Sequence, residues 1–155
     1  MRLFFILTLL FSLSQAKMFL LPQEAKKAQN EIIELIDDSK KSITIAMYNF
    51  SYGKFAKALV RAKKRGLEIK VILDAKKIKE KNSEYYYLKN NGIEPFLAKK
   101  KMHLKVAIFD NKKIVFGSTN WTKASFSKNH EFLIIEKNKK YIKKMNNHLY
   151  NLLKE

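Results

Sequence analysis

The 155-residue chain contains no cysteine. It therefore forms no disulfide, and it has no thiolate to bind a metal, act as a nucleophile or carry a lipid anchor. Its fold has to be stabilised by the apolar core or by association with a second copy. The length is enough for one domain with a proper core, and no internal repeat is visible. We therefore expect a single domain.

Acidic residues are also scarce, with 14 Asp and Glu against 32 Lys and Arg, which gives a formal net charge of +18. Nearly all of the basic residues are lysines; the arginines are Arg2, Arg61 and Arg65. Such a charge attracts polyanions, meaning nucleic acid or an anionic membrane surface. The alternative is a lysine-rich, solvated surface with no such partner. The charge thus indicates a kind of partner and says nothing about the fold.

The first sixteen residues differ in character from the rest. Met1-Arg2 is a short positive start, Leu3 to Leu13 is an apolar run, and Ser14-Gln15-Ala16 supplies small residues for a signal peptidase. This pattern is typical of a secretory signal peptide. The run is shorter than the roughly 20 residues of a membrane span. We therefore predict a signal peptide over 1–16 and an exported domain over 17–155, which is periplasmic, associated with the outer membrane, or secreted. An uncleaved anchor continuing through 18–21 is the alternative.

Hydrophobic periodicity in the domain predicts both helices and strands. Apolar stripes near helical spacing predict helices over 22–38, 54–65, 83–89 and 139–154. Alternating or β-branched apolar runs predict strands over 42–49, 67–73, 93–97, 104–109, 114–116 and 132–135. This order predicts an α/β fold, an α+β sandwich with a mixed β-sheet flanked by helices.

One stretch combines polar side chains at regular spacing: His103, Lys105, Asp110, Gly117, Ser118 and Asn120. If its two strands pair around Asn111-Lys112, His103 faces Asn120 and Lys105 faces Ser118. Side chains alternate along a strand, so these four groups then point to one side of the hairpin. Gly117 allows a ligand or another backbone to come close, and a bulge beyond it would shift this register.

The predicted cluster has a cation, two neutral hydrogen-bonding groups and one titratable nucleophile. It lacks both a ring of carboxylates and a second nearby histidine, so we predict no metal and no cofactor. A phosphodiester fits it. Lys105 and Asn120 can hold the non-bridging oxygens while His103 attacks phosphorus.

The spacing of these residues resembles the HKD motif of the phospholipase D superfamily, and the domain is similar in length and element order to its small, secreted, single-motif Nuc-type endonucleases. The resemblance implies a phospholipase D-like fold and two motifs per active site. This chain has one motif, so a homodimer with a single composite site is implied. One His103 then acts as nucleophile and the other as general acid and base, without metal, and nucleic acid products carry a 5′-phosphate.

The resemblance also assigns roles to neighbouring residues. Glu131 matches a glutamate that supports the catalytic histidine, and Asp110 completes the motif, although turn formation alone also explains an aspartate there. Ser118 and Gly117 are expected to contact substrate. The run Lys99, Lys100 and Lys101 precedes His103 and is expected to guide phosphates. Trp121 either stacks on a base or packs under the site.

Three functions fit these features. The first is an exported, sequence-nonspecific endonuclease that cuts DNA, preferably single-stranded, with RNA as a further substrate. The second is a phospholipase D or phosphatidyl-transfer enzyme that works at a membrane surface, although no amphipathic membrane segment follows the signal. The third is a surface protein that binds DNA without cutting it.

Overall fold

The computed structural model describes residues 16–155, so the predicted signal peptide lies outside the described residues except for Ala16. The centre of the fold is one seven-stranded sheet in the order β1-β7-β6-β5-β2-β3-β4. The strands are β1 (Lys17–Leu21), β2 (Ser42–Met47), β3 (Glu68–Asp74), β4 (Phe96–Ala98), β5 (Lys105–Phe109), β6 (Lys113–Gly117) and β7 (Glu131–Glu136). The helices are α1 (Ala25–Asp38), α2 (Gly53–Lys64), α3 (Tyr85–Asn90), α4 (Lys123–Ser127) and α5 (Lys139–Leu152), with a short 3₁₀ turn at Lys77–Lys79.

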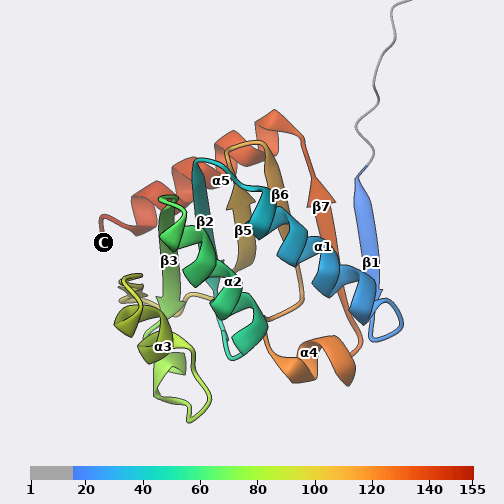
Figure 1. Ribbon diagram of the computed structural model, residues 1–155, viewed down its shortest axis with the longest axis horizontal. Helices are drawn as coiled ribbons and strands as arrows, with labels where there is room; N and C mark the ends of the chain where they lie inside the picture. The colour runs from blue at the N-terminus through green and yellow to red at the C-terminus, as the bar shows by residue number, and fades with distance from the viewer. Residues whose placement is uncertain (1–15) are drawn as a thin grey trace, which may run out of the picture.

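Helices cover both faces of the sheet (Figure 1), and α1 and α2 lie on the face opposite α5. Side chains that alternate along β2 divide between two cores. Ile43 and Ile45 pack with α1 and α2, whereas Ala46 packs with the α5 side. The α1 stripe buries Ala28 and Ile32, as its helical spacing predicted. The predicted α/β fold with a mixed sheet flanked by helices is confirmed.

Strand directions bring several chain segments to one edge of the sheet. β2, β3 and β4 are parallel, whereas β5 is antiparallel to β2, β6 to β5, and β7 to β6. The ends of β2, β3 and β6 therefore meet the starts of β5 and β7 at the same edge. Residues just beyond these ends come together there, although they are far apart in the sequence.

One strand and one α-helix of the described residues, as well as the 3₁₀ turn, were not predicted from the sequence. Residues 17–21 form β1, which pairs antiparallel with β7 and buries Phe19 and Leu21 while Met18 and Leu20 stay exposed. Residues 18–21 therefore belong to the sheet and do not extend the apolar run of 3–13. The short α4 begins after Thr122, whose side chain accepts a hydrogen bond from the Ser125 N–H. No helix within 16–155 is long and apolar enough to span a membrane.

The hairpin of β5 and β6 has a different register from the predicted one. Val106 pairs with Phe116 and Phe109 with Lys113, so the turn comprises residues 110–112 instead of Asn111-Lys112 alone. Asp110 and Asn111 adopt φ values of +50° and +54°. Aspartate and asparagine tolerate this left-handed region better than most residues, which permits the extra turn residue. The predicted pairing of Lys105 with Ser118 is therefore wrong by one position.

Candidate active site

His103 and Lys105 lie at the edge where β5 begins, and their side chains meet. Lys105 Nζ is 3.2 Å from His103 Nε2 and donates a 2.9 Å hydrogen bond to the His103 carbonyl. The Tyr48 ring packs edge-on against the imidazole, with ring centroids 4.3 Å apart. Because an ammonium group can only donate, Nε2 is the nitrogen that carries the lone pair. This tautomer leaves a nucleophilic nitrogen beside a cation.

The pKa values of both groups are lowered. Loss of solvent contact is the main cause of the lowered His103 pKa, and the charges of Lys105 and Lys101 add to it against a weaker opposing effect of Asp74. Loss of solvent contact also lowers the Lys105 pKa, although the Glu131 carboxylate opposes that change. A lowered pKa favours the neutral imidazole, which is the form that a nucleophile requires.

Asn120 lies beyond β6 and is half-buried. Its Oδ1 accepts a 3.2 Å hydrogen bond from the Asn49 backbone N–H, which belongs to the segment that follows β2. This contact orients the side chain and leaves the Nδ2 hydrogens to donate to another group. Asn120 therefore presents donors at the same sheet edge as His103 and Lys105.

Trp121 is part of the core. The side chain is 2% exposed, and its ring packs against Phe50 with centroids 5.2 Å apart. Its carbonyl accepts the Ser51 N–H, and a parallel bridge joins it to Phe50. Of the two alternatives for Trp121, packing under the site is the one that the structure supports, and its assignment to substrate binding is corrected accordingly.

Ser118 and Glu131 form a hydrogen-bonded pair, in which the serine hydroxyl donates to the carboxylate. The same hydroxyl accepts the Phe132 N–H at 3.1 Å. Glu131 makes no hydrogen bond to His103 among the bonds of the described residues; its influence on the cluster is the charge it presents to Lys105. The Ser118 hydroxyl thus makes both of its hydrogen bonds within the protein, and it ties Glu131 to the end of β6.

Gly117 accommodates protein backbone. A Cβ atom built at this position would lie 2.2 Å from the Phe132 carbonyl oxygen and 2.9 Å from Leu133 Cα. Of the two predicted reasons for a glycine, close approach of another backbone is the one that the structure supports. The assignment of Gly117 to substrate contact is corrected accordingly.

Asp74 was missed by the sequence analysis, although it positions the histidine loop. It is buried at the end of β3, and its Oδ2 accepts the Met102 N–H at 3.0 Å. Its Oδ1 accepts the N–H groups of Lys76 and Lys77. An aspartate directly after an apolar strand was the available signal. Within residues 16–155, no three His, Asp or Glu side chains gather closely enough to hold a metal ion.

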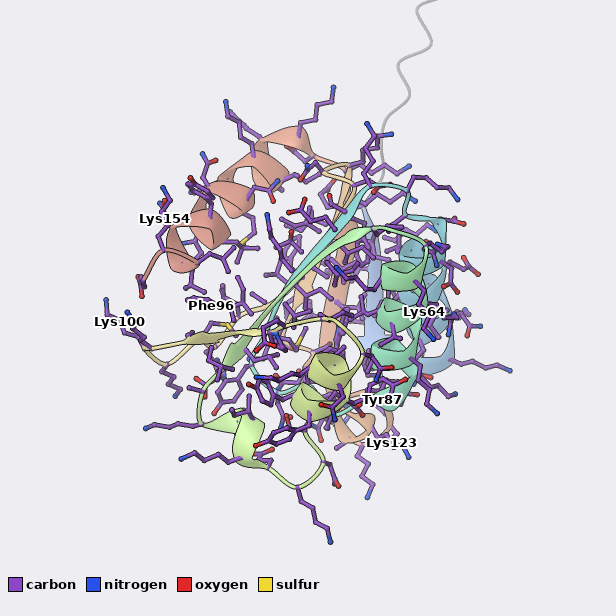
Figure 2. The ribbon with its side chains drawn as sticks, turned by 60° about the vertical axis from the view of Figure 1, so that its left-hand side comes forward. Lys64, Tyr87, Phe96, Lys100, Lys123 and Lys154 are labelled. Atoms are coloured by element: carbon purple, nitrogen blue, oxygen red, sulfur yellow. The ribbon has the colours of Figure 1, made fainter. Side chains whose placement is uncertain are left out.

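The three lysines before His103 have different surroundings. Lys101 is close enough to lower the pKa of both His103 and Lys105. The Lys99 ammonium donates instead to the Glu155 carbonyl at the chain end. Figure 2 shows Lys100 at the tip of the loop, pointing away from the body of the molecule. The structure therefore brings Lys101 into the cluster but not Lys99 or Lys100.

Asp110 does not join the cluster, because it lies at the opposite end of β5. Its Oδ1 accepts the N–H groups of Lys41 and Ser42 at 2.7 and 3.0 Å, and its Oδ2 accepts that of Lys40 at 2.9 Å. Burial alone would raise its pKa, but these three hydrogen bonds outweigh that effect and lower it. The catalytic assignment of Asp110 is thus corrected to a structural one, tying the hairpin turn to the start of β2.

We expect Asp110→Asn to lower stability without lowering kcat. The amide keeps one acceptor oxygen, so the loss of charged hydrogen bonds should cost about 1–3 kcal/mol and lower Tm by roughly 3–10 °C. A depressed carboxyl pKa stabilises the fold above its ordinary value of 3.8, and this contribution is lost as pH falls through the folded-state pKa. The difference in Tm should therefore shrink below about pH 4. Asp38→Asn, at an exposed position, is the matched control and should change Tm by little; an equal loss in both variants would contradict this role.

Known proteins resemble this chain over most of its length. The family model described as "Cardiolipin synthase, PLD-like domain" matches residues 32–153. NucT from Helicobacter pylori is 29% identical, with a TM-score of 0.83 over 90% of this chain and 96% of that one. The phospholipase D family member Nuc from Salmonella typhimurium is 30% identical, with a TM-score of 0.81 over 89% and 93%.

A curated relative from Rickettsia bellii, named phospholipase D, is 35% identical over 106 residues, which is 67% of this chain but 53% of the relative. The chain thus spans about half the length of that relative, whereas it covers nearly all of Nuc and NucT. Because the family model spans most of the chain and the sheet carries the His103, Lys105 and Asn120 side chains at one edge, the chain belongs to the phospholipase D superfamily of phosphodiesterases.

Proposed function

We propose that this protein is an exported, metal-independent, sequence-nonspecific endonuclease that hydrolyses phosphodiester bonds in DNA, preferring single strands and also accepting RNA. The observation that carries the proposal is the exposed His103, with its Nε2 3.2 Å from the Lys105 ammonium. The charge of +18 supports a polyanionic substrate. The match to Nuc and NucT, which covers nearly all of both proteins, supports a function shared with them.

In the first step, His103 Nε2 attacks phosphorus and forms an N–P bond, while Lys105 and Asn120 donate to the non-bridging oxygens. The P–O3′ bond breaks, and the leaving oxygen takes a proton from an imidazolium. The chain supplies one motif histidine, so the acid is His103 of the partner subunit in a homodimer. Charge stabilisation of this kind typically contributes about 10²–10³-fold in rate.

In the second step, the partner subunit's His103 takes a proton from water, and the resulting hydroxide attacks phosphorus. The N–P bond breaks, which releases a 5′-phosphate and restores both histidines. A histidine nucleophile and a histidine acid need no Lewis acid, which is the reason for proposing metal independence.

An apolar patch beside the site supports the homodimer. Met18 and Leu20 of β1 are each 56% exposed, and Phe132 of β7 is 39% exposed. Leu20 and Phe132 are paired in the sheet, and Phe132 directly follows Glu131. Exposed apolar groups of this kind mark contact surfaces. A second copy packed on this patch would lie next to the sheet edge that carries His103.

The proposal is tested with residues 17–155 on a fluorescent single-stranded oligonucleotide in excess chelator. We expect cutting that persists in the chelator, produces 5′-phosphate ends and is as fast on unrelated sequences. Binding without cutting of DNA or RNA would contradict the nuclease function and leave DNA capture.

The same apolar patch favours lipid hydrolysis as the second candidate function. Vesicles of phosphatidylcholine and cardiolipin test it: release of headgroup or phosphatidate, with no cutting of DNA, would favour the lipid enzyme. Phe132→Glu separates the two roles of the patch. If the patch is the dimer interface, the variant becomes monomeric and loses DNA cutting; if it contacts lipid, the variant stays oligomeric and loses vesicle binding.

The pH dependence of kcat/KM should depend on the charge of Lys101. Protonation of the nucleophile removes activity as pH falls through the His103 pKa, and Lys101 lowers that pKa. We therefore expect Lys101→Gln to move the profile of kcat/KM against pH toward higher pH. This shift does not depend on any change in the maximum value of kcat/KM. The substitution is present in both subunits, so the pKa values of both histidines of the composite site rise. The acidic and the alkaline limbs of the profile should therefore move in the same direction. Lys100→Gln removes a neighbouring charge that points away (Figure 2) and should leave the profile in place; equal shifts would contradict this role of Lys101.

A further inference from the structure

We propose that single-stranded nucleic acid extends from the site along a groove between α2, α3 and α4, with its phosphates against Lys54, Lys57, Lys81 and Lys123. This inference rests on the proposed nuclease function and assigns the path of the substrate strand. It concerns residues outside the His103 cluster and its motif.

The groove is a hollow with a volume of about 1140 Å³. One wall is the first turn of α2, another is the segment just before α3, and the third is the start of α4. Hydroxyl and amide side chains such as those of Ser51 and Asn82 line it between the lysines. A lining of cations and small hydrogen-bonding groups suits a sugar-phosphate backbone.

The four groove lysines are available to bind anions. All four are exposed, and none lies within 4.0 Å of a carboxylate among the ion pairs of the described residues. Lys77, nearer to the cluster, differs because its ammonium pairs with Glu80. Four unpaired charges from three separate segments therefore converge on one hollow.

The groove begins at the candidate active site. Asn49 lines it, and the Asn49 N–H donates to Asn120 Oδ1 at 3.2 Å. The preceding residue, Tyr48, packs against the His103 ring. A strand whose scissile phosphate lies at His103 can therefore continue past Asn49 into the groove.

Glu84 supplies a test of opposite sign, because it is the carboxylate among the groove-lining residues. It lies against Gly53, the first residue of α2, and the charge of Lys57 acts on it. Burial raises the pKa of this carboxyl. A negative charge at this position repels phosphates, so its removal should tighten binding where lysine removal weakens it.

The experiment measures binding of a 20-nucleotide single strand by fluorescence anisotropy, in a His103→Asn background that prevents cutting. The groove variant carries Lys→Gln at 54, 57, 81 and 123, and the matched control carries Lys→Gln at 139, 140, 143 and 144. The control lysines are exposed on α5, on the other face of the sheet. Figure 2 shows Lys123 and Lys154, just past α5, at opposite ends of the molecule.

We expect the groove variant to bind at least about tenfold more weakly, with a salt slope reduced by about 0.7 for each lost contact. The control should lose at most about twofold, and Glu84→Gln should bind more tightly than the unchanged background. Equal losses in the groove and control variants would overturn the proposal, since diffuse attraction would then explain binding.

A second measurement separates this inference from the nuclease function. With His103 intact, the groove variant should cut a dinucleotide as fast as the unchanged protein, because so short a substrate does not reach the groove. Its KM for the 20-mer should rise with little change in kcat. If neither the unchanged protein nor the groove variant cuts either substrate, the nuclease function fails. The binding comparison still shows whether the groove binds the strand. If cutting is normal and the groove variant binds like the control, the groove assignment fails alone.

Discussion

His103→Asn should lower the rate of DNA cutting by about 10⁴-fold or more, because it removes both the nucleophile and the general acid of the composite site. The side chain is exposed, so folding and Tm should be unchanged. Binding of uncut DNA should also persist, since the phosphate-binding lysines remain. The measurement is single-turnover cutting of an oligonucleotide, with binding by the same preparation as the reference.

The informative control for this substitution is His130→Asn. His130 is an exposed histidine next to Glu131 at the same edge, and no hydrogen bond or ring contact found within residues 16–155 joins it to His103 or Lys105. It should change the free energy of unfolding by no more than about 0.5 kcal/mol, as surface substitutions usually do, and it should keep most of the activity. If both variants lost activity to a similar extent, the effect of His103→Asn would reflect a general disturbance of this sheet edge. That result would contradict the role of His103 as the nucleophile.

Heterodimers in which one subunit keeps His103 and the other carries His103→Asn should lose at least about 100-fold in activity, because one histidine cannot serve as both nucleophile and acid. Two different affinity tags isolate such heterodimers from co-expressed chains. A matched heterodimer with two intact histidines and the same tags gives the reference rate.

The result distinguishes one composite site from two independent sites. If each subunit cuts alone, the heterodimer keeps half of the reference activity. If the site is shared, nearly all activity is lost although half of the histidines remain. A monomeric protein with full activity would contradict the shared site directly.

Most of the fold could be predicted from the sequence because its signals are local. Helices α1, α2 and α5 follow their apolar stripes, and β2, β3 and β7 follow runs of alternating or β-branched residues. β1 is hard to predict because its alternation, with Phe19 and Leu21 inward, directly follows the apolar leader and looks like its continuation. α4 is too short to show a period and depends on the Thr122 cap.

The site was predictable where spacing along one strand decides it and unpredictable where the turn or the tertiary structure decides it. His103 and Lys105 share a face because they are two residues apart in an extended segment. Lys105 is the first residue of β5, and His103 comes two positions before it. The register of Ser118 depended on the three-residue turn, which the left-handed φ values of Asp110 and Asn111 produce. The role of Asp110 depends on N–H groups 68 to 70 residues away. No local pattern contains that contact.

The measurement that tests the central claim most directly is transfer of a labelled DNA end to the protein. Attack by His103 on phosphorus leaves the downstream fragment joined through its 5′-phosphate to the imidazole until water releases it. Single-stranded DNA labelled at its 3′ end, mixed with protein in chelator and quenched in alkaline detergent within the first turnover, should label the protein band. The same DNA labelled at its 5′ end should not. His103→Asn should give no labelled band with either substrate. Rapid cutting by the unchanged protein that gives no adduct at any quench time, or an adduct that persists in His103→Asn, would contradict the account.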